Sequence, residues 1–237
     1  MRHLDLFSGI GGFALAARWV GWETIGFCEN DKYCQQVLKK HWPDVPIFDD
    51  VRELKGESIG SVDIITGGYP CQPFSLAGKR RGKEDDRHLW PEFARLIREL
   101  RPRWVLGENV AGHITMGLDE VLADLEGLGY TWEAFVIPAC AVDAQHRRDR
   151  VWIVADSRRI DERPEKGGSS RIAVNSKAQS IGSTSRHRFT NCGRWSVEPN
   201  VGRVAHGIPR RVDRLRGLGN AIVPQVAEMI FRSIDAN

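Results

Sequence analysis

The sequence predicts an α/β fold in which a mostly parallel sheet carries helices on both faces. Two observations support this class. Short apolar runs alternate with stretches of helical spacing as far as residue 155, and glycines or acidic residues stand where several of those runs end. Alternation of strands and helices is typical of parallel sheets, because the crossover helices cover both faces.

Seven apolar runs have the length of buried strands, and four stretches between them have the spacing of amphipathic helices. Pro91 suits the first position of a helix, where an N–H group would have no partner. The expected strands are His3–Phe7, Thr24–Cys28, Pro46–Phe48, Val62–Thr66, Arg103–Gly107, Trp132–Ile137 and Val151–Ala155. The expected helices are Gly12–Val20, Asp31–Lys40, Pro91–Leu100 and Leu118–Leu128.

The character of the chain changes after Ala155. Residues 156–195 are rich in Ser, Gly and Arg and poor in periodic apolar positions, which is typical of a loop-rich insert. Order returns near Trp195, and NAIVPQVAEMIFRSI indicates a turn followed by an apolar-faced closing helix. We therefore expect a main domain over 1–155, a short basic segment over 156–205, and a return to the main domain over 206–237.

Composition limits the class of protein. The 237 residues suffice for one sizeable core, and a net charge of +3 with a pI of about 8.7 is only weak evidence for a polyanionic partner. No apolar run reaches the roughly 18–20 residues of a membrane span, and the first residues lack the apolar core of a signal peptide. The five cysteines are scattered without a C-x-x-C pair, which disfavours disulfides and zinc and favours a reducing cytoplasm.

Glycines and acids at three successive strand ends indicate one ligand. The first strand runs into FSGIGG, whose glycines let the backbone bend beside a ligand. Glu29 follows the second strand, where dinucleotide-binding folds carry a ribose-binding carboxylate, and Asp49 and Asp50 follow the third. Each feature alone is also explained by a tight turn or a solvated loop charge. Together they describe an adenosine-containing ligand lying across the sheet ends.

The fourth strand leads into GGYPCQPFS, where prolines fix φ on either side of Cys71 and Gln72. A structural cysteine normally packs inside a strand or helix as a small hydrophobe, whereas this turn presents a thiol at the sheet edge. A nucleophilic cysteine reacts as its thiolate, which positive neighbours stabilise. The basic stretch LAGKRRGKEDDR downstream is either a mobile lid or a solvated surface loop.

The fifth strand ends in ENV, and HRRDR precedes the seventh. Glu108, at the ligand edge beside an apolar wall, would have a raised pKa and donate a proton, or would serve as a helix cap. Alternation along an extended segment sends Arg148 and Arg150 to one face. Two guanidinium groups there could hold a phosphate or favour the thiolate of Cys71.

These motifs, in this order, resemble those of the C5-specific cytosine methyltransferases: DLFSGIGG, the acid at Glu29, GGYPCQPFS, ENV, HRRDRVWIVA and GLGNAIVPQ. The resemblance covers most of residues 1–155 and about 206–230, and PCQ followed by ENV at this spacing is highly specific. It implies a Rossmann-like, S-adenosylmethionine-dependent methyltransferase fold. It also implies DNA (cytosine-5-)-methyltransferase activity, in which Cys71 attacks C6 and Glu108 engages N3 of a cytosine flipped out of the duplex.

The resemblance assigns roles to residues, and it implies no metal. The catalytic residues that it implies are Cys71, Glu108, Arg148 and Arg150. The residues that it places at the cofactor are Phe7, Gly9, Gly11, Gly12, Glu29, Asn30, Asp50, Val51, Pro70, Leu89 and Asn220. The residues expected at the DNA are Gln72, Ser75, Lys79, Arg80, Arg81, Arg186 and Arg188.

The sequence departs from the family pattern in two places. About 50 residues, 156–205, stand where relatives carry a larger target-recognition domain. Residues 156–195 carry nine basic side chains against four acidic ones, which suits phosphate contact, although a solvated linker would look the same. The usual arginine-and-glutamate helix before the GN-x-x-P element is not evident, and GIPRRVDRLRGLGN stands in its place.

Two other functions fit the same motifs: methylation of a tRNA cytosine, as in one branch of the family, and a non-catalytic DNA-binding relic. A nucleotide-binding dehydrogenase would give no role to PCQ or ENV. Duplex DNA is favoured because Glu198–Pro224 resembles compact phage and bacterial DNA enzymes. We therefore expect a monomer in the cytoplasm of a bacterial or phage-infected cell, without membrane association, whose partners are double-stranded DNA and a possible cognate restriction endonuclease.

Overall fold

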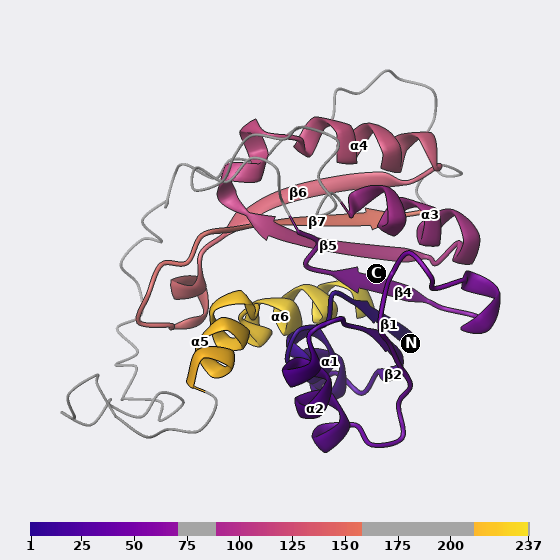
Figure 1. Ribbon diagram of the computed structural model, residues 1–237. Coiled ribbons are helices and arrows are strands. Elements are labelled where there is room, and N and C mark those ends of the chain that lie inside the picture. The colour runs from indigo at the N-terminus through magenta and orange to yellow at the C-terminus, as the bar shows by residue number, and fades with distance from the viewer. Residues whose placement is uncertain (71–88, 158–210, 237) are drawn as a thin grey trace, which may run out of the picture.

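One seven-stranded sheet forms the centre of the computed structural model, which describes residues 1–70, 89–157 and 211–236 (Figure 1). The strands lie in the order β3-β2-β1-β4-β5-β7-β6. They are β1 (Arg2–Leu6), β2 (Glu23–Cys28), β3 (Ile47–Phe48), β4 (Ile64–Gly67), β5 (Trp104–Val110), β6 (Thr131–Ile137) and β7 (Arg150–Asp156). The α-helices are α1 (Gly12–Trp19), α2 (Lys32–His41), α3 (Trp90–Leu100), α4 (Leu118–Gly127), α5 (Arg211–Asn220) and α6 (Pro224–Asp235). Short 3₁₀ helices are η1 (Gly56–Ser58), η3 (Ala111–Thr115) and η4 (Ala139–Val142).

The sheet is parallel from β3 to β5, and only β7 runs against its neighbours β5 and β6. A parallel connection needs a long crossover, but the link between β6 and β7 holds only η4, so the chain turns back on itself there. The mostly parallel sheet is therefore confirmed. The carboxyl ends of β1 to β5 meet at one edge, which is where such folds bind ligands.

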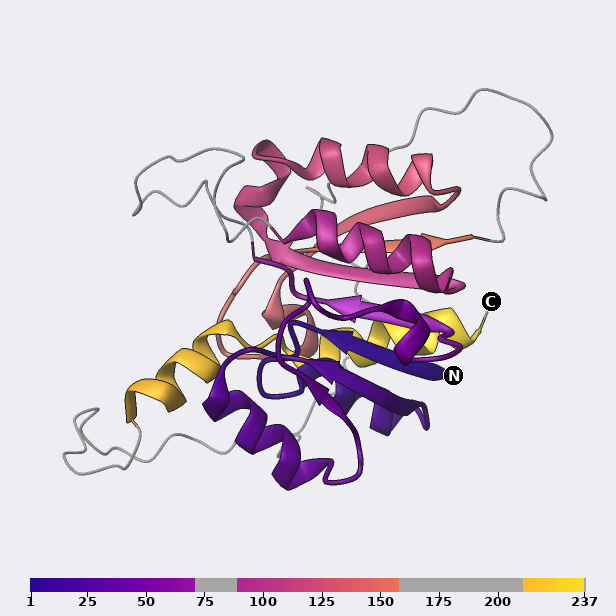
Figure 2. The same ribbon diagram turned by 45° about the vertical axis from the view of Figure 1, so that its right-hand side comes forward.

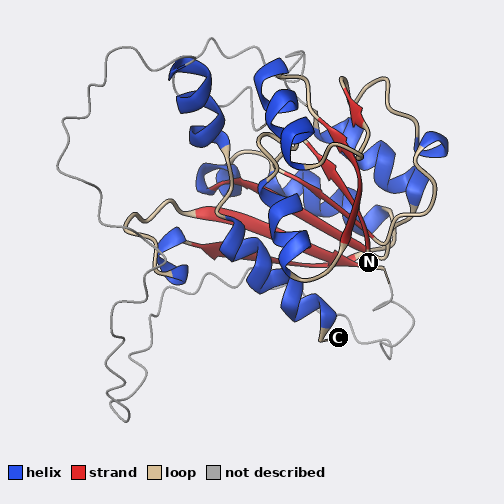
Figure 3. Ribbon diagram, turned by 90° about the horizontal axis from the view of Figure 1, so that it is seen from below, coloured by secondary structure: helices blue, strands red, loops and turns tan. Residues whose placement is uncertain are grey.

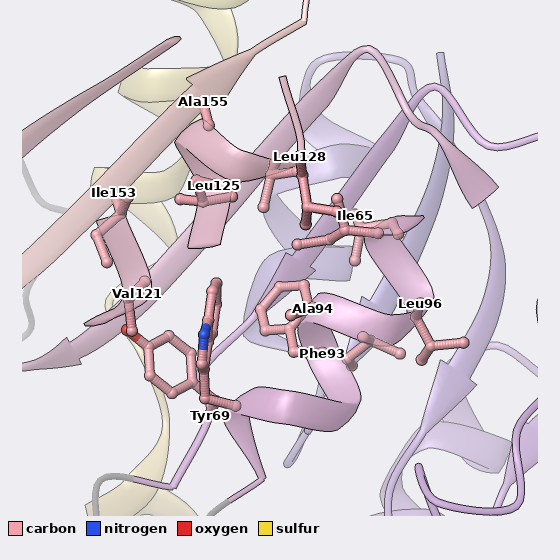
Figure 4. Close-up of a cluster of buried hydrophobic side chains, with 14 of the residues drawn as sticks. Ile65, Tyr69, Phe93, Ala94, Leu96, Val121, Leu125, Leu128, Ile153 and Ala155 are labelled. Carbon is pink, nitrogen blue, oxygen red and sulfur yellow. The ribbon is translucent and has the colours of Figure 1, made fainter. Parts of the chain in front are cut away.

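Helices cover both faces of the sheet (Figures 1 and 3). Adjacent residues of β4 point to opposite sides: Ile65 packs in the cluster with α3 and α4, whereas Ile64 packs in the cluster with α1 and α6. Figure 4 shows the first of these clusters, where Ile65 lies with Phe93 of α3 and Val121 of α4. β4 and most of β5 are buried on both faces, so their sequences are near-continuous apolar runs rather than alternating ones.

The predicted strands and helices are confirmed, but some of their ends differ. β5 continues to Val110 instead of ending at Gly107, because β7 pairs with it as far as Val110 and Arg150. The ENV motif is therefore the last part of a paired strand rather than the loop after it. The closing helix is confirmed as α6, which starts at Pro224. A helix, α5, also forms over RVDRLRGLGN, where no helix was evident from the sequence.

A buried polar network joins β1 to β4 just below the ligand edge. His3 Nε2 lies 2.7 Å from Thr66 Oγ1, which in turn donates to Asp5 Oδ1 at 3.1 Å. Burial lowers the pKa of His3 to about 3 and raises the pKa of Asp5 well above its usual range. Burial therefore disfavours the charged form of both side chains, and hydrogen bonds between His3, Thr66 and Asp5 join these strands. Within the described ranges, no helix is long and apolar enough to cross a membrane.

Candidate active site

The turn from β1 into α1 is bent by residues with positive φ. Phe7 has φ 53°, Gly9 has φ 54° and Gly11 has φ 86°. A Cβ atom on Gly11 would stand 2.8 Å from the Trp42 ring, whereas one on Gly9 would meet no heavy atom within 4 Å. A non-glycine residue such as Phe7 rarely adopts positive φ, and such strain gathers at functional sites. The turn is therefore packed against Trp42 at Gly11, whereas the space beside Gly9 is open and a ligand could approach the backbone there.

Glu29, which follows β2, is fixed beside this turn. Its Oε2 accepts from the backbone N–H of Gly9 at 2.6 Å, and its Oε1 accepts from the N–H of Asp31 at 2.7 Å. Burial raises the pKa of Glu29, and those two backbone donors act in the opposite direction. A carboxylate offers about four lone-pair directions, so this one retains acceptor capacity for a hydroxyl group. Its neighbour Asn30 is exposed.

The two acids after β3 have different partners. Asp50 Oδ2 accepts from Arg52 Nη2 at 2.9 Å, and this side-chain bond, together with the Arg52 N–H, lowers the pKa of Asp50. Asp49 is exposed and accepts from Lys32 Nζ at 3.0 Å and from Gln35 Nε2 at 2.7 Å. Asp50 is thus a half-buried anion at the same edge as Glu29.

The other residues expected at the cofactor differ in exposure. Val51 is 2% exposed, and its carbonyl accepts from Arg95 Nη2 at 2.8 Å, so this residue belongs to the core. Pro70 and Leu89 are half-buried and flank residues 71–88, which lie outside the described ranges. Asn220 is exposed at the end of α5.

Glu108 is the buried acid of the site, only 7% exposed within β5. Its Oε1 lies 2.9 Å from Arg150 Nε, and the two residues come from adjacent antiparallel strands. Burial raises the pKa of Glu108 to about 7, and this outweighs the attraction of Arg150 and of Arg148, which lower it. A carboxyl group in this state is protonated in a large share of molecules at neutral pH and can act as a proton donor.

Arg148 does not follow the extended geometry that the sequence predicted. Its φ is 40°, two residues before β7 begins, so strict alternation with Arg150 fails and that expectation is wrong. The Arg148 guanidinium instead donates from Nη2 to the carbonyls of Gly219 and Ala221, at 2.7 Å each. Its charge still lowers the pKa of Glu108, so both arginines act on that carboxyl group.

The chain that leads into the PCQ motif lies directly against β5. A Cβ atom on Gly68 would be 3.3 Å from Glu108 Oε2, and one on Gly107 would be 3.3 Å from the Tyr69 ring. Asn109 Nδ2 donates to the Tyr69 carbonyl at 3.0 Å. Eight of the residues predicted for catalysis or DNA contact lie nearby in sequence or in the later basic segment, but outside the described residues. Besides Arg186 and Arg188, these are Cys71, Gln72, Ser75, Lys79, Arg80 and Arg81, so they stay predictions.

The C-terminal turn completes the glycine side of the site. A Cβ atom on Gly12 would stand 2.6 Å from Ile222 Cγ1, and one on Gly217 would stand 3.3 Å from Ile10 Cγ2. Figure 2 shows α5 reaching past the sheet at the edge where β4 and β5 end. Segments from the two ends of the sequence are therefore neighbours here, and Arg148 ties the second of them to the start of β7.

Sequence reasoning missed Tyr69, Asn109, His113 and Ile222. Tyr69 lies inside GGYPCQPFS and Asn109 inside ENV, so their nearness in sequence to Cys71 and Glu108 could have marked them as site residues. Nothing in the sequence indicates that His113 would contact Tyr69, but His113 Nε2 lies 2.9 Å from the Tyr69 phenolic oxygen.

In the part of the chain that the structure describes, no three His, Cys, Asp or Glu side chains are grouped as a metal site.

Residues 1–196 match the family model described as C-5 cytosine-specific DNA methylase. The Type II methyltransferase M.HhaI of Haemophilus parahaemolyticus is 35% identical over 159 residues, which are 65% of this chain and 48% of that protein. The Type II methyltransferase M.PspPI of Psychrobacter sp. (strain TA137) is 37% identical over 159 residues, 64% of this chain and 38% of that protein. The chain spans about half, or less, of the length of the curated relatives it matches.

Solved structures resemble the fold. A putative DNA modification methyltransferase encoded within a prophage of E. coli aligns with TM-score 0.59 and 27% identity over 70% of this chain and 49% of its own. A triple mutant of Spodoptera frugiperda DNMT2 aligns with TM-score 0.60 and 23% identity over 72% of this chain and 54% of its own. At that lower identity the second likeness concerns the fold alone. Both confirm the Rossmann-like methyltransferase fold.

Proposed function

This chain belongs to the C-5 cytosine-specific DNA methylase family, and from that premise we propose that it is a DNA (cytosine-5-)-methyltransferase. It would move a methyl group from S-adenosylmethionine to C5 of a flipped cytosine, through a covalent adduct with Cys71. The observation that supports this most is Glu108: a buried acid, paired with Arg150, lies against the chain that enters the PCQ motif.

The chemistry explains why the site needs both a thiol and an acid. Carbon C5 of cytosine is a weak nucleophile, so the Cys71 thiolate first adds to C6 and forms a C–S bond, while negative charge develops at N3. A protonated Glu108 supplies the proton that neutralises N3. The resulting enamine can then take a methyl group at C5. A base then takes the C5 proton, the C–S bond breaks to release the Cys71 thiolate, and the proton on N3 returns to Glu108, which restores the cytosine ring.

Arg150 sets which oxygen of Glu108 is free for this task. Its Nε holds Oε1 at 2.9 Å, whereas Oε2 is the oxygen that faces Gly68. A proton on Oε2 would therefore face the chain leading to Cys71. We assign Arg150 to orienting and partly stabilising Glu108. We assign Arg148 to the same electrostatic environment and to holding the Gly219–Ala221 turn.

The strand ends fit S-adenosylmethionine, which when bound supplies an electrophilic methyl group on a sulfonium sulfur. Open space at Gly9 lets a ligand approach the backbone, and the fixed Glu29 carboxylate can accept from ribose hydroxyls. Asp50 can accept from an exocyclic amine. We assign the remaining family positions to the same cofactor site. They are Phe7, Gly11, Gly12, Asn30, Val51, Pro70, Leu89 and Asn220.

The proposed substrate is double-stranded DNA, because an extruded base is needed for attack above the ring. The residues proposed for DNA contact lie in 71–81 and 186–188, outside the described part of the chain. We also propose a cognate restriction endonuclease as partner, by analogy with relatives named as Type II methyltransferases. Protection of the host genome from a candidate endonuclease by this chain would test that pairing.

The decisive experiment expresses the chain in a methylation-free bacterial host and maps 5-methylcytosine by bisulfite sequencing. Methylation at one recurring sequence context supports the proposal and identifies the target. A parallel assay with labelled cofactor offers duplex DNA and tRNA to the purified chain. Label in tRNA alone would show that the chain methylates tRNA instead of DNA, as one branch of the family does. Intact cofactor binding with label in neither would identify a non-catalytic relic.

A further inference from the structure

We infer that Asn109 and Tyr69 are positioning residues for the nucleophile: they hold the backbone that leads into Cys71 against the strand that carries Glu108. This inference rests on the proposed function, which gives Cys71 and Glu108 their chemical roles. It concerns two side chains that touch neither the base nor the cofactor in that mechanism. They act through the backbone at Tyr69, two residues before Cys71.

The first observation is where the regular strand pairing stops. The ladder between β4 and β5 ends at Gly67 and Gly107, yet the chain continues beside β5. There the Tyr69 carbonyl accepts from Asn109 Nδ2 at 3.0 Å, so a side-chain amide takes the place of a ladder donor. Asn109 is 4% exposed, so water has little access to this bond.

The second observation is that the Asn109 amide has one orientation. Its Oδ1 accepts from the N–H of Val110 at 2.8 Å, which leaves the NH₂ end for the Tyr69 carbonyl. An aspartate at this position would keep the acceptor and lose the donor, and would set an anion against a carbonyl oxygen. The hydrogen-bond pattern therefore requires an amide rather than an acid next to Glu108.

The third observation is that the Tyr69 ring anchors the same residue from the other side. The ring is 3% exposed and packs on Trp90 with ring centroids 5.1 Å apart and on Phe93 at 6.0 Å. Its phenolic oxygen lies 2.9 Å from His113 Nε2. Figure 4 shows Tyr69 at the rim of the cluster that holds Phe93 and Val121. The residue is thus held by its carbonyl and by its ring at once.

Together these contacts give one strand end two tasks. Glu108 presents the acid, and the next residue, Asn109, fixes the path of the chain toward the thiol. A thiolate must meet C6 above the ring plane, and a displacement of about 1 Å can cost about 100-fold in rate. Holding the Tyr69 backbone against the strand that carries Glu108 fixes the start of the path to Cys71 relative to the acid.

The test compares Asn109→Ala and Tyr69→Phe with the parent chain and with Gln36→Ala, which truncates an exposed amide on α2. Three quantities are measured: the single-turnover rate of adduct formation on 5-fluorocytosine duplex, the affinity for S-adenosylmethionine, and the rate of alkylation at Cys71 by iodoacetamide across pH. Peptide mass mapping reports Cys71 apart from the other cysteines. Tyr69→Phe keeps the ring packing and loses only the phenolic bond, so it remains informative if the alanine variant unfolds.

For Asn109→Ala we expect adduct formation to slow by about tenfold or more, with cofactor affinity and the pH profile of Cys71 alkylation unchanged. Tyr69→Phe should show a smaller slowing of the same step, and Gln36→Ala none. Adduct formation at the parent rate in both site variants would overturn the inference. So would a parallel loss of cofactor affinity and adduct rate, since that is the result of general unfolding. Failure of the parent chain itself to form an adduct would instead count against the proposed function.

Discussion

Glu29 and Glu108 show how surroundings give two carboxyl groups different tasks. Burial raises the pKa of both. Glu29, however, accepts from two backbone N–H groups and lies beside the open turn at Gly9. Glu108 has an arginine partner and a pKa near 7, which suits an acid that gives up a proton and regains it in each cycle. In the proposed mechanism the first accepts hydrogen bonds and the second transfers a proton.

Replacing Glu29 with alanine should weaken cofactor binding more than it changes the saturated rate. Loss of a charged hydrogen bond costs roughly 1.5–3 kcal/mol, or about tenfold to 150-fold in affinity. Calorimetric titration with S-adenosylmethionine measures this, and Asp49→Ala, which removes an exposed acid from the same edge, is the matched control. Equal affinity in the Glu29 variant and the parent chain would remove Glu29 from the cofactor site.

Glu108 should make folding stability depend on pH in a defined direction. Its folded-state pKa of about 7 lies above the ordinary 4.5, so its contribution is fully present below pH 4.5 and is lost as pH rises to 7. In the parent chain the free energy of unfolding should fall between pH 5 and 8 as Glu108 loses its proton. Glu108→Gln cannot titrate, so in this variant the fall should be smaller, by at most about 3 kcal/mol. Urea denaturation at both pH values measures the difference. A wild-type slope retained in the variant would mean that Glu108 does not titrate in this window.

Arg148 illustrates what residue spacing leaves undetermined. The sequence correctly drew attention to Arg148 and Arg150 together, but alternation requires extended φ at both, and Arg148 has φ 40°. Its partners, the carbonyls of Gly219 and Ala221, come from the far end of the sequence. Only the packing of the C-terminal turn could reveal them.

At the level of elements, most of the fold could be predicted because the local patterns agree with the tertiary structure. The apolar runs that became β1 and β2, and the helical spacing that became α3, are buried where the pattern requires. The end of β5 could not be predicted, since the pairing with β7 extends it. Helix α5 could not either, because GLGN carries two glycines and its charged residues give no apolar stripe.

The contact between α1 and the C-terminal turn can be tested through Gly12. A methyl group there would stand 2.6 Å from Ile222 Cγ1, so Gly12→Ala should destabilise the fold by about 1–3 kcal/mol and weaken cofactor binding. In an Ile222→Ala background the same change should cost less than about 1 kcal/mol, because the obstructing side chain is gone. Thermal and urea unfolding of the four proteins measure this coupling. Additive effects would mean that the two positions do not touch.

At the scale of the whole molecule, the fold brings five sequence-distant pieces to one sheet edge. The glycine turn, Glu29, the entry to PCQ, ENV with its paired arginine, and the C-terminal turn meet there. The residues that we propose for cofactor and base chemistry are therefore described ones, except for Cys71 itself. The short basic segment expected to recognise the target, residues 156–205, lies almost entirely outside the described residues, so the sequence-based expectation of phosphate contact by Arg186 and Arg188 stays a prediction.

The most direct test of the central claim is covalent capture of the chain on duplex DNA in which cytosine is replaced by 5-fluorocytosine. Fluorine at C5 cannot leave as a proton does, so the adduct persists once the methyl group has been transferred. With S-adenosylmethionine present, we predict a denaturation-resistant complex whose mass includes one methyl group and whose cross-linked peptide contains Cys71. Cys71→Ser should form none while binding the cofactor within a few-fold of the parent chain. A parent chain that binds cofactor and DNA but forms no adduct, or a serine variant that keeps turning over, would contradict the account.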